Sequence, residues 1–401
     1  MDLYKGSLYW PTTLANVEVP EYPTLNKEII CDCLIIGGGM SGALCSYLLA
    51  KSSLNIVLVD KRKVSTGSSS ANTGLLQYAN DKMLHEFAET IGEEKAVRFY
   101  QLCYEAMKKL QVIAESLQAD VQFQSRKSLY YATDENDVEK LQKEYKLLKK
   151  HGFDAAYLTA EEIEKTYGFK KPAAILTSGD AEINPQRFVV ELIKEANQKN
   201  VQVFEHTEVT EEGVYNGYWK FTSDNGVIYA KKVIYSTGYE GIDFAQKEGG
   251  ELHRTYAIVT SPLPRFPMWK DQCLIWETKR PYFYMRTTLN NRIIAGGLDE
   301  DKMEAPANQV ILAKYGENLL KKVKEHFPDY QMEVDHVYGA TFGESDDGIP
   351  YIGEHPEKDN VFYCLGYGGN GTVYSMFGAD ILCGLIINGN HPDSDLVRLD
   401  R

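Results

Sequence analysis

Three glycines and an aspartate near the N-terminus have the types and spacing of a dinucleotide-binding turn. Gly37, Gly39 and Gly42 lie between an apolar run and an amphipathic run, and Asp60 ends the next apolar run. The first glycine permits a tight turn, the second lets the backbone approach a pyrophosphate, and the third lets a helix pack closely on a strand. The helix N-terminus offers N–H groups and a positive dipole end to the phosphates. The predicted contacts also include the neighbouring Met40, Ser41 and Lys61.

Asp60 limits the choice of cofactor without deciding it. A carboxylate at the end of the second strand accepts hydrogen bonds from ribose hydroxyls, which both NAD and FAD carry, and it disfavours the 2′-phosphate of NADP. The turn alone therefore predicts a dinucleotide and leaves NAD and FAD open.

A second glycine motif lies close to the C-terminus. Gly366, Gly368 and Gly371 repeat the spacing, but the polar residues after the following apolar helix contain no second strand and no ribose-binding acid. We therefore reject a second dinucleotide site. A glycine-lined helix N-terminus still attracts negative charge, and its predicted donors extend to Gly369, Asn370 and Thr372.

The elements that position these residues can be predicted from apolar periodicity and turn signals. Asn184 and Pro185 have the types expected at an N-cap and a first helical position. The ranges 201–206, 218–223 and 226–238 are predicted to form a small antiparallel meander, and residues 281–288 and 291–297 a hairpin. The predicted helices cover residues 43–53, about 81–118, about 136–151, about 185–200 and about 306–326, and further strands cover 28–36, 55–60 and parts of 252–298.

Composition excludes several classes of protein. The 401-residue chain has a net charge of −14, which argues against binding to a phosphate backbone. The sequence shows no apolar run near the roughly 20 residues of a membrane span and no secretory signal. Its seven cysteines are scattered without metal-ligand spacing, so we expect reduced thiols, no metal site and a cytoplasmic location.

Further stretches resemble the D-amino acid oxidase family of FAD enzymes, which includes glycine and sarcosine oxidases. They are TGSSSANTGLLQY at 66–78, the helix signature at 181–209, KKVIYSTGYEG at 231–241, the hairpin at 281–297 and the block at 347–372. The matches extend from about residue 30 to 385. The resemblance selects FAD over NAD.

The resemblance also implies a fold and a set of cofactor contacts. It implies an α/β fold in which a Rossmann-like FAD domain with a β-meander is interleaved with a substrate domain built on an antiparallel sheet with flanking helices. We expect residues 1–110, 175–250 and 330–401 to form the FAD domain, and 111–174 and 251–329 the substrate domain. The implied FAD contacts are Gly67, Ser68, Ser69, Ser70, Asn72, Thr73, Gly74, Leu75, Val209, Thr237, Gly238 and Gly339.

In the resembled family, a neutral amine or amino acid loses hydride to flavin N5, and the imine product is hydrolysed. The electrons then pass to oxygen or another acceptor. No catalytic acid or base is implied. Arg286 could clamp a carboxylate, or it could face solvent or pair with an acid; Tyr256 and Tyr284 could line the pocket or simply pack in the sheet. The full set of predicted substrate contacts is Gln77, Tyr256, Tyr284, Arg286 and Tyr338.

Two departures from the family are visible. Members that act on simple D-amino acids or glycine carry an arginine at the position of residues 339–342, where this chain has Gly-Ala-Thr-Phe. An amine or an N-substituted substrate is therefore an alternative to an amino acid. Sarcosine-oxidase-like members attach FAD through a cysteine, whereas the segment 338–350 contains none, so we expect noncovalent FAD.

Other functions remain open at the sequence level. An FAD dehydrogenase of 2-hydroxy acids or glycerol phosphate is the nearest alternative enzyme. A flavin-binding subunit without its own turnover is an alternative of another class, and an NAD-dependent dehydrogenase is a further one.

Overall fold

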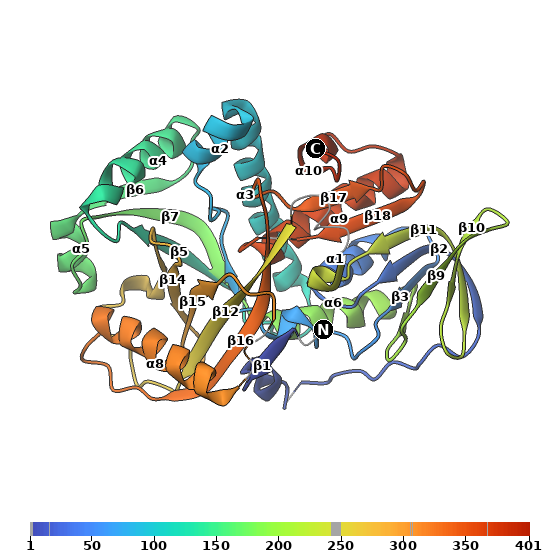
Figure 1. The fold of residues 1–401 in the computed structure, drawn as a ribbon, viewed down its shortest axis with the longest axis horizontal. Helices are drawn as coiled ribbons and strands as arrows, with labels where there is room; N and C mark the ends of the chain where they lie inside the picture. The colour runs from blue at the N-terminus through green and yellow to red at the C-terminus, as the bar shows by residue number, and fades with distance from the viewer. Residues whose placement is uncertain (1–2, 16, 242–249, 305, 307, 367) are drawn as a thin grey trace.

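The protein is built on two large sheets, connected by chain segments that cross several times between them (Figure 1). The computed structural model describes residues 3–15, 17–241, 250–304, 306, 308–366 and 368–401. Residue 367, within the second glycine motif, and residues 242–249 lie outside the described residues.

The smaller sheet is the dinucleotide-binding scaffold. Its main path is β17 (Tyr351–Glu354), β18 (Val361–Leu365), β11 (Val227–Tyr235), β2 (Glu28–Ile36), β3 (Ile56–Val59) and β8 (Val201–Phe204). All pairs along this path are parallel except β17 with β18. Strands buried on both faces read as continuous apolar runs, which is why β3 is IVLV with every residue buried.

Helices and a meander cover opposite faces of this sheet. One face packs against α1 (Met40–Leu49), α6 (Pro185–Asn197) and α9 (Gly371–Asn388), and α1 contacts both of the other helices. The meander on the other face consists of β9 (Thr210–Tyr215), β10 (Tyr218–Thr222) and β11. The prediction that residues 201–206 belong to the meander is wrong, because β8 pairs in parallel with β3.

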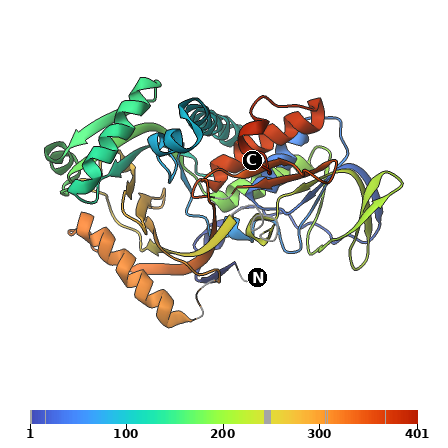
Figure 2. The ribbon, with the colours of Figure 1, turned by 45° about the horizontal axis from the view of Figure 1, so that its top comes forward.

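The larger sheet has mixed pairing. Its order is β1 (Tyr4–Gly6), β16 (Val334–Ser345), β12 (Gly250–Thr260), β15 (Ile293–Glu300), β14 (Phe283–Thr287), β13 (Leu274–Glu277), β5 (Gln124–Tyr131), β7 (Ala173–Glu182) and β4 (Leu75–Leu76), with β6 (Ala155–Thr159) beside β7. Helix α8 (Gln309–His326) packs on β12, β15 and β16, on the side away from α9 (Figure 2). Four strands of this sheet come from residues that were predicted, wholly or largely, to belong to the FAD domain. They are β1, β4, β7 and β16.

The remaining helices show which local signals decide helix ends. Asn184 caps α6 by accepting a hydrogen bond from the Arg187 N–H at 3.1 Å, with Pro185 in the first position, as predicted. The single helix predicted over 81–118 is instead α2 (Leu84–Ile91) and α3 (Glu93–Ser116), because Gly92 adopts φ +86°. The other helices are α4 (Val138–Lys150), α5 (Ala160–Tyr167) and α10 (Ser394–Val397).

Helix α9 is long and apolar enough to cross a membrane by length and composition. The prediction that no apolar segment approaches the length of a membrane span is therefore corrected for this one helix. The helix packs against α1 and α3, and 61% of its residues are buried within the protein, as in the core helix of a globular domain.

Candidate active site

A cavity of about 420 Å³ lies at the carboxyl ends of the parallel strands and reaches the larger sheet. Ile36, Val59 and Tyr235, which end β2, β3 and β11, line it, together with Gly366 directly after β18. The cavity has three parts: a glycine turn at α1, a charged end beside β3, and an end where α9 meets the larger sheet.

The glycine turn is shaped by backbone contacts that exclude side chains. Gly37 has φ +108°, and a Cβ on Gly42 would lie 1.8 Å from the Gly37 carbonyl oxygen. A Cβ on Gly39 would meet only the Ser69 Oγ, at 3.3 Å, so this position is open toward the cavity. The same Ser69 hydroxyl accepts the Met40 N–H at 3.0 Å, which joins the loop after β3 to the start of α1. These contacts leave room for a phosphate at the helix N-terminus.

The charged end is organised by Asp60 and Glu240. Asp60 accepts the N–H groups of Gly38 and Arg62, each at 2.7 Å, while its burial raises its pKa. Glu240 receives Lys61 at 3.0 Å and Arg62 at 2.7 Å. Burial raises the pKa of Glu240, but the two cations hold it below its ordinary value. The cations of this end are therefore already paired within the chain.

At the opposite end, the N-terminus of α9 meets the loop that follows β3. The Asn72 side chain donates to the Thr372 hydroxyl at 3.3 Å and accepts the Gly74 N–H at 2.7 Å. The Asn370 amide donates to the Ala79 carbonyl at 2.7 Å, so this side chain holds the neighbouring loop. The cavity is here bounded by the helix N-terminus itself.

Aromatic and small polar side chains form the wall on the larger sheet. Trp276 on β13 pairs with Tyr284 on β14, and the Trp276 ring stacks on Tyr130 with centroids 3.8 Å apart. Tyr282 and Tyr284 lie on one side of their strand, with ring centroids 5.7 Å apart. The further lining residues at this end are Gln77, Asp81, Thr255, Ala340, Thr341 and Phe342.

Most of the predicted contacts come together in this cavity. The predicted residues that line it are Gly37, Gly39, Met40, Ser41, Asp60, Lys61, Gly67, Ser68, Ser69, Asn72, Thr73, Leu75, Gln77, Val209, Thr237, Gly238, Tyr284, Gly366, Gly368, Gly369, Asn370, Gly371 and Thr372. Gly42, Ser70 and Gly74 support the turns without lining it, as shown by the Ser70 hydroxyl, which donates to the Gly67 carbonyl at 2.8 Å.

Arg286 lies outside the cavity lining, in the protein interior. Its guanidinium donates to the carbonyls of Thr73, Ile183 and Thr287 at 2.9 to 3.0 Å and lies 3.6 Å from Glu182. The side chain is 2% exposed, so it has no free donor directed at a substrate. Of the alternatives that the sequence left open for Arg286, the structure shows internal pairing with an acid, which holds the Thr73 loop, and not a carboxylate clamp in the cavity lining.

Three other predicted residues also lie outside the lining. Tyr256 donates to Glu300 and stacks on Tyr315 of α8 with centroids 3.8 Å apart, because it faces away from the cavity. Gly339 pairs with Tyr256 across β12 and β16 and contacts Pro306, and Tyr338 is buried in a cluster with Tyr9 and Trp10.

Sequence reasoning missed several lining residues. Strand alternation places Thr255, the neighbour of Tyr256, on the cavity side, and the same period joins Tyr282 to Tyr284. The i, i+2 tyrosines of the PYFYM run were a usable signal for Tyr282. No sequence signal marked Trp276 or Asp81 as lining residues, because their positions depend on how distant segments pair.

Unpaired buried donors remain along the cavity wall. Ser236 Oγ and Trp276 Nε1 are buried and have no hydrogen-bond partner among the residues the structure describes, and both residues line the cavity. Buried polar groups are normally paired, so these two atoms are free to hydrogen-bond to a molecule bound in the cavity. With Asp60 and the α9 N-terminus at opposite ends and the open Gly39 turn as a separate part, the residues fit an extended dinucleotide such as FAD.

Comparisons with known proteins agree with this geometry. The glycine oxidase of Bacillus licheniformis is 24% identical over 89% of this chain and 93% of its own length. The structure of glycine oxidase from Geobacillus kaustophilus matches with a TM-score of 0.79 at 20% identity, covering 93% of this chain and 99% of that one. L-proline dehydrogenase from P. horikoshii matches with a TM-score of 0.75 at 16% identity, covering 94% and 98%. These structures share the fold.

The family model described as DAO, FAD dependent oxidoreductase, matches residues 32–385, which include both glycine motifs and nearly every residue that lines the cavity. The chain therefore belongs to the DAO family of FAD-dependent oxidoreductases.

Proposed function

We propose that this enzyme oxidises the C–N bond of an amine or amino acid with FAD as the cofactor. The observation that carries the proposal is the end of the cavity where the α9 N-terminus faces a wall of Trp276, Tyr282 and Tyr284. Relatives named glycine oxidase and a structural neighbour named L-proline dehydrogenase support this class of substrate.

Different parts of the cavity lining are assigned to different parts of the cofactor. We assign the cofactor phosphates to the Gly39 turn and the ribose to Asp60, and the flavin ring to the space between Thr73 and the start of α9. When bound, FAD supplies a two-electron acceptor. The helix dipole of α9 favours negative charge at its N-terminus, and the aromatic wall limits the access of water to the substrate.

Noncovalent FAD remains our prediction. Cys364 is fully buried in the core packed against α9, and no cysteine lines the cavity within the described residues. Cytoplasmic location, and oxygen or another acceptor as the final oxidant, also remain predictions.

A substrate with a phosphate or a second acid group fits this cavity less well. Such groups are bound by arginine or lysine. Among the described lining residues, the cations are Lys61 and Arg62, and both pair with Glu240 at the opposite end. The cavity therefore favours amine oxidation over the glycerol phosphate alternative, and the 2-hydroxy acid alternative, whose substrate carries a single carboxylate as an amino acid does, is tested by experiment.

Anaerobic reduction of the FAD-loaded protein tests the proposal. We expect loss of flavin absorbance with at least one amine or amino acid, and none with 2-hydroxy acids or glycerol phosphate at equal concentration. Reduction by the hydroxy compounds alone would replace the proposal with the alternative enzyme. A flavin that stays oxidised with every compound until a partner protein is added would favour the subunit alternative.

A further inference from the structure

The cations that line the cavity share their end of it with carboxylates, among them Asp60, Glu208 and Glu240. The described cationic lining residues, Lys61 and Arg62, lie at the Glu240 end. At the aromatic end the charged lining residue is Asp81, whose side chain is 24% exposed. A carboxylate bound beside the aromatic wall would therefore meet the Asp81 carboxylate, and no cation lines this end among the described residues.

Two arginines near this end are already engaged. Arg286 is fully enclosed by three carbonyls and Glu182, as described above. Arg280 donates to the backbone carbonyl of Asp81 at 2.7 Å, lies 3.8 Å from its carboxylate, and lies over the Tyr282 ring at 4.6 Å. Arg286 is therefore committed to contacts within the chain, whereas Arg280, whose side chain is 48% exposed, is held beside the Asp81 carboxylate and the Tyr282 ring.

More carboxylates lie next to residues that line this end of the cavity, which we call its mouth. Glu344 lies two residues from the lining residue Phe342 on β16, and therefore on the same side of the strand. Burial, and then the charge of Asp81, raise the pKa of Glu344 to about 7. Burial raises the pKa of Asp299 to about 6, and Asp299 is bonded to the lining residue Thr255.

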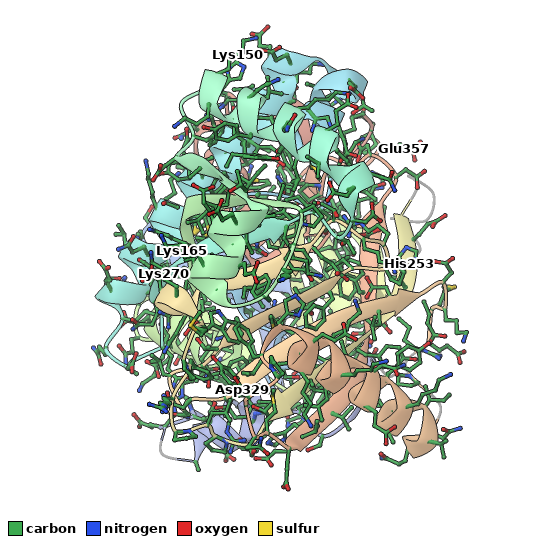
Figure 3. All side chains as sticks on the ribbon, turned by 90° about the vertical axis from the view of Figure 1, so that its left-hand side faces the viewer. Lys150, Lys165, His253, Lys270, Asp329 and Glu357 are labelled. Atoms are coloured by element: carbon green, nitrogen blue, oxygen red, sulfur yellow. The ribbon has the colours of Figure 1, made fainter. Side chains whose placement is uncertain are left out.

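Positive groups do not neutralise this mouth. His253 lies 4.0 Å from Glu344 and 3.3 Å from Asp301, and Figure 3 shows it near the edge of the molecule in that view. The Arg280 guanidinium is coupled to both Asp299 and Glu344. The carboxylates outnumber these partners, so the mouth attracts cations.

The aromatic wall provides a surface that suits a cation. The faces of tryptophan and tyrosine attract ammonium groups by about 0.5–2 kcal/mol. Trp276 is 6% exposed, and its indole N–H has no partner among the described residues, as expected of a side chain that contacts a ligand. Because this N–H is neutral, it supplies no countercharge for a carboxylate.

We propose that the aromatic end of the cavity accepts a basic amine that has no free carboxylate, guided by Asp81, Asp299 and Glu344 and held against Trp276, Tyr282 and Tyr284. This inference rests on the proposed function and narrows its substrate class. The proposed substrate has an uncharged substituent at the position where an amino acid has its carboxylate.

Probes that cannot be oxidised separate this inference from the reaction. Tetramethylammonium and trimethylacetate have similar shapes and opposite charges, and their binding to the FAD-loaded protein can be followed by the change in the visible flavin spectrum. At pH 8, above the pKa of Glu344, we expect tetramethylammonium to bind at least about tenfold more tightly. Equal affinities, tighter binding of the anion, or no response to tetramethylammonium would overturn the inference.

Matched variants locate the effect. Glu344→Gln and Asp329→Asn each remove one negative charge, and Asp329 lies low in Figure 3, well away from His253. We expect Glu344→Gln to weaken tetramethylammonium binding about fivefold and Asp329→Asn to leave it unchanged. Equal effects of the two variants would overturn the assignment to the mouth.

The oxidation itself is tested with a substrate pair. We expect N-methylethylamine to reduce the flavin at least about tenfold faster than N-methylglycine at equal concentration. If N-methylglycine is the faster, the inference fails and the proposed function stands. If neither these nor any other amine or amino acid reduces the flavin while the cation still binds preferentially, the proposed function fails and the charge preference stands.

Discussion

At the scale of single residues, Arg286 shows how a cation near an active site can serve the fold. Its guanidinium joins the Thr73 loop to Ile183 and to its own strand. We expect Arg286→Met to destabilise the protein by on the order of 3 kcal/mol, because three buried carbonyls lose their partner and Glu182 keeps only Arg126. The Thr73 loop should loosen, so FAD affinity should fall as well.

Thermal unfolding and titration of the apoprotein with FAD measure these two effects. Arg187 is a matched control, because it also donates to a carbonyl, that of Thr13, but does not line the cavity. Arg187→Met should lower stability and leave FAD affinity unchanged. An Arg286→Met protein with the FAD affinity and melting temperature of the original would contradict the positioning role.

Single residues could be predicted where their role depends on a local sequence pattern. Gly37, Gly39 and Asp60 could be placed from the sequence because their roles are set within one local unit. Thr255 and Tyr256 could not be separated, because the side of β12 that faces the cavity depends on its pairing with β15 and β16, where the register also shifts. Apolar alternation does not carry that information.

At the scale of elements, the turn that begins α1 contains one glycine that faces the cofactor site and another that is needed for packing. We expect Gly39→Ala to weaken FAD binding by about tenfold or more without lowering the stability of the apoprotein, because its Cβ would occupy open space near the pyrophosphate. Gly42→Ala should instead destabilise the apoprotein, since its Cβ would overlap the Gly37 carbonyl. Apoprotein melting and FAD titration of both variants measure this contrast, and identical behaviour would refute it.

The second glycine motif makes a related prediction at α9. Gly371 is the first residue of this helix, and a Cβ there would meet the Gly366 carbonyl at 3.1 Å. We expect Gly371→Leu to weaken FAD binding by about tenfold, because a large side chain would enter the cavity at the helix N-terminus. Ile387→Leu, at an exposed position of the same helix, is the control. Full flavin content and activity in Gly371→Leu would show that this end does not contact the cofactor.

Elements were predictable where their signals were local. The Asn184 cap and the Asn290–Asn291 hairpin follow from residue type, and Asn291 adopts φ +54° in the turn between β14 and β15. The break at Gly92 was missed, because a single glycine within a helical pattern is compatible with either outcome. Strand β8 was assigned to the meander because its parallel partner β3 is far away in the sequence.

At the scale of the whole molecule, the site exists because the chain alternates between two sheets. The loop after β3 contributes Thr73, then β4 enters the larger sheet, and α9 returns to the smaller one beside Asn72. The cofactor and the substrate wall therefore meet at a junction that no contiguous segment contains. Motif spacing predicted the dinucleotide turn and the family resemblance implied a separate substrate sheet, whereas only the tertiary pairing brings Asp81 and Trp276 to the same cavity.

The stability of this assembly should depend on pH through His326, which lies between α8 and the larger sheet. Burial lowers the pKa of His326 to about 4, and the ring contacts the Lys322 carbonyl at 2.8 Å and the Tyr131 hydroxyl at 3.0 Å. Above pH 6.5 the residue is neutral in both the folded and unfolded states. As the pH falls from 6.5 to 4, the unfolded chain binds a proton that the folded one excludes, so stability decreases by on the order of 3 kcal/mol.

Comparison with a variant isolates this contribution from the other groups that titrate. Asp180, buried in the same protein, has a pKa raised to about 6, so its ionisation destabilises the fold as the pH rises and opposes the histidine. His326→Phe removes only the histidine contribution, and the exposed His206→Gln is the control. We expect the difference in unfolding free energy between His326→Phe and the original protein to shift in favour of the variant as the pH falls from 6.5 to 4. A difference that stays constant over this range would show that His326 takes up its proton as readily in the folded protein as in the unfolded chain.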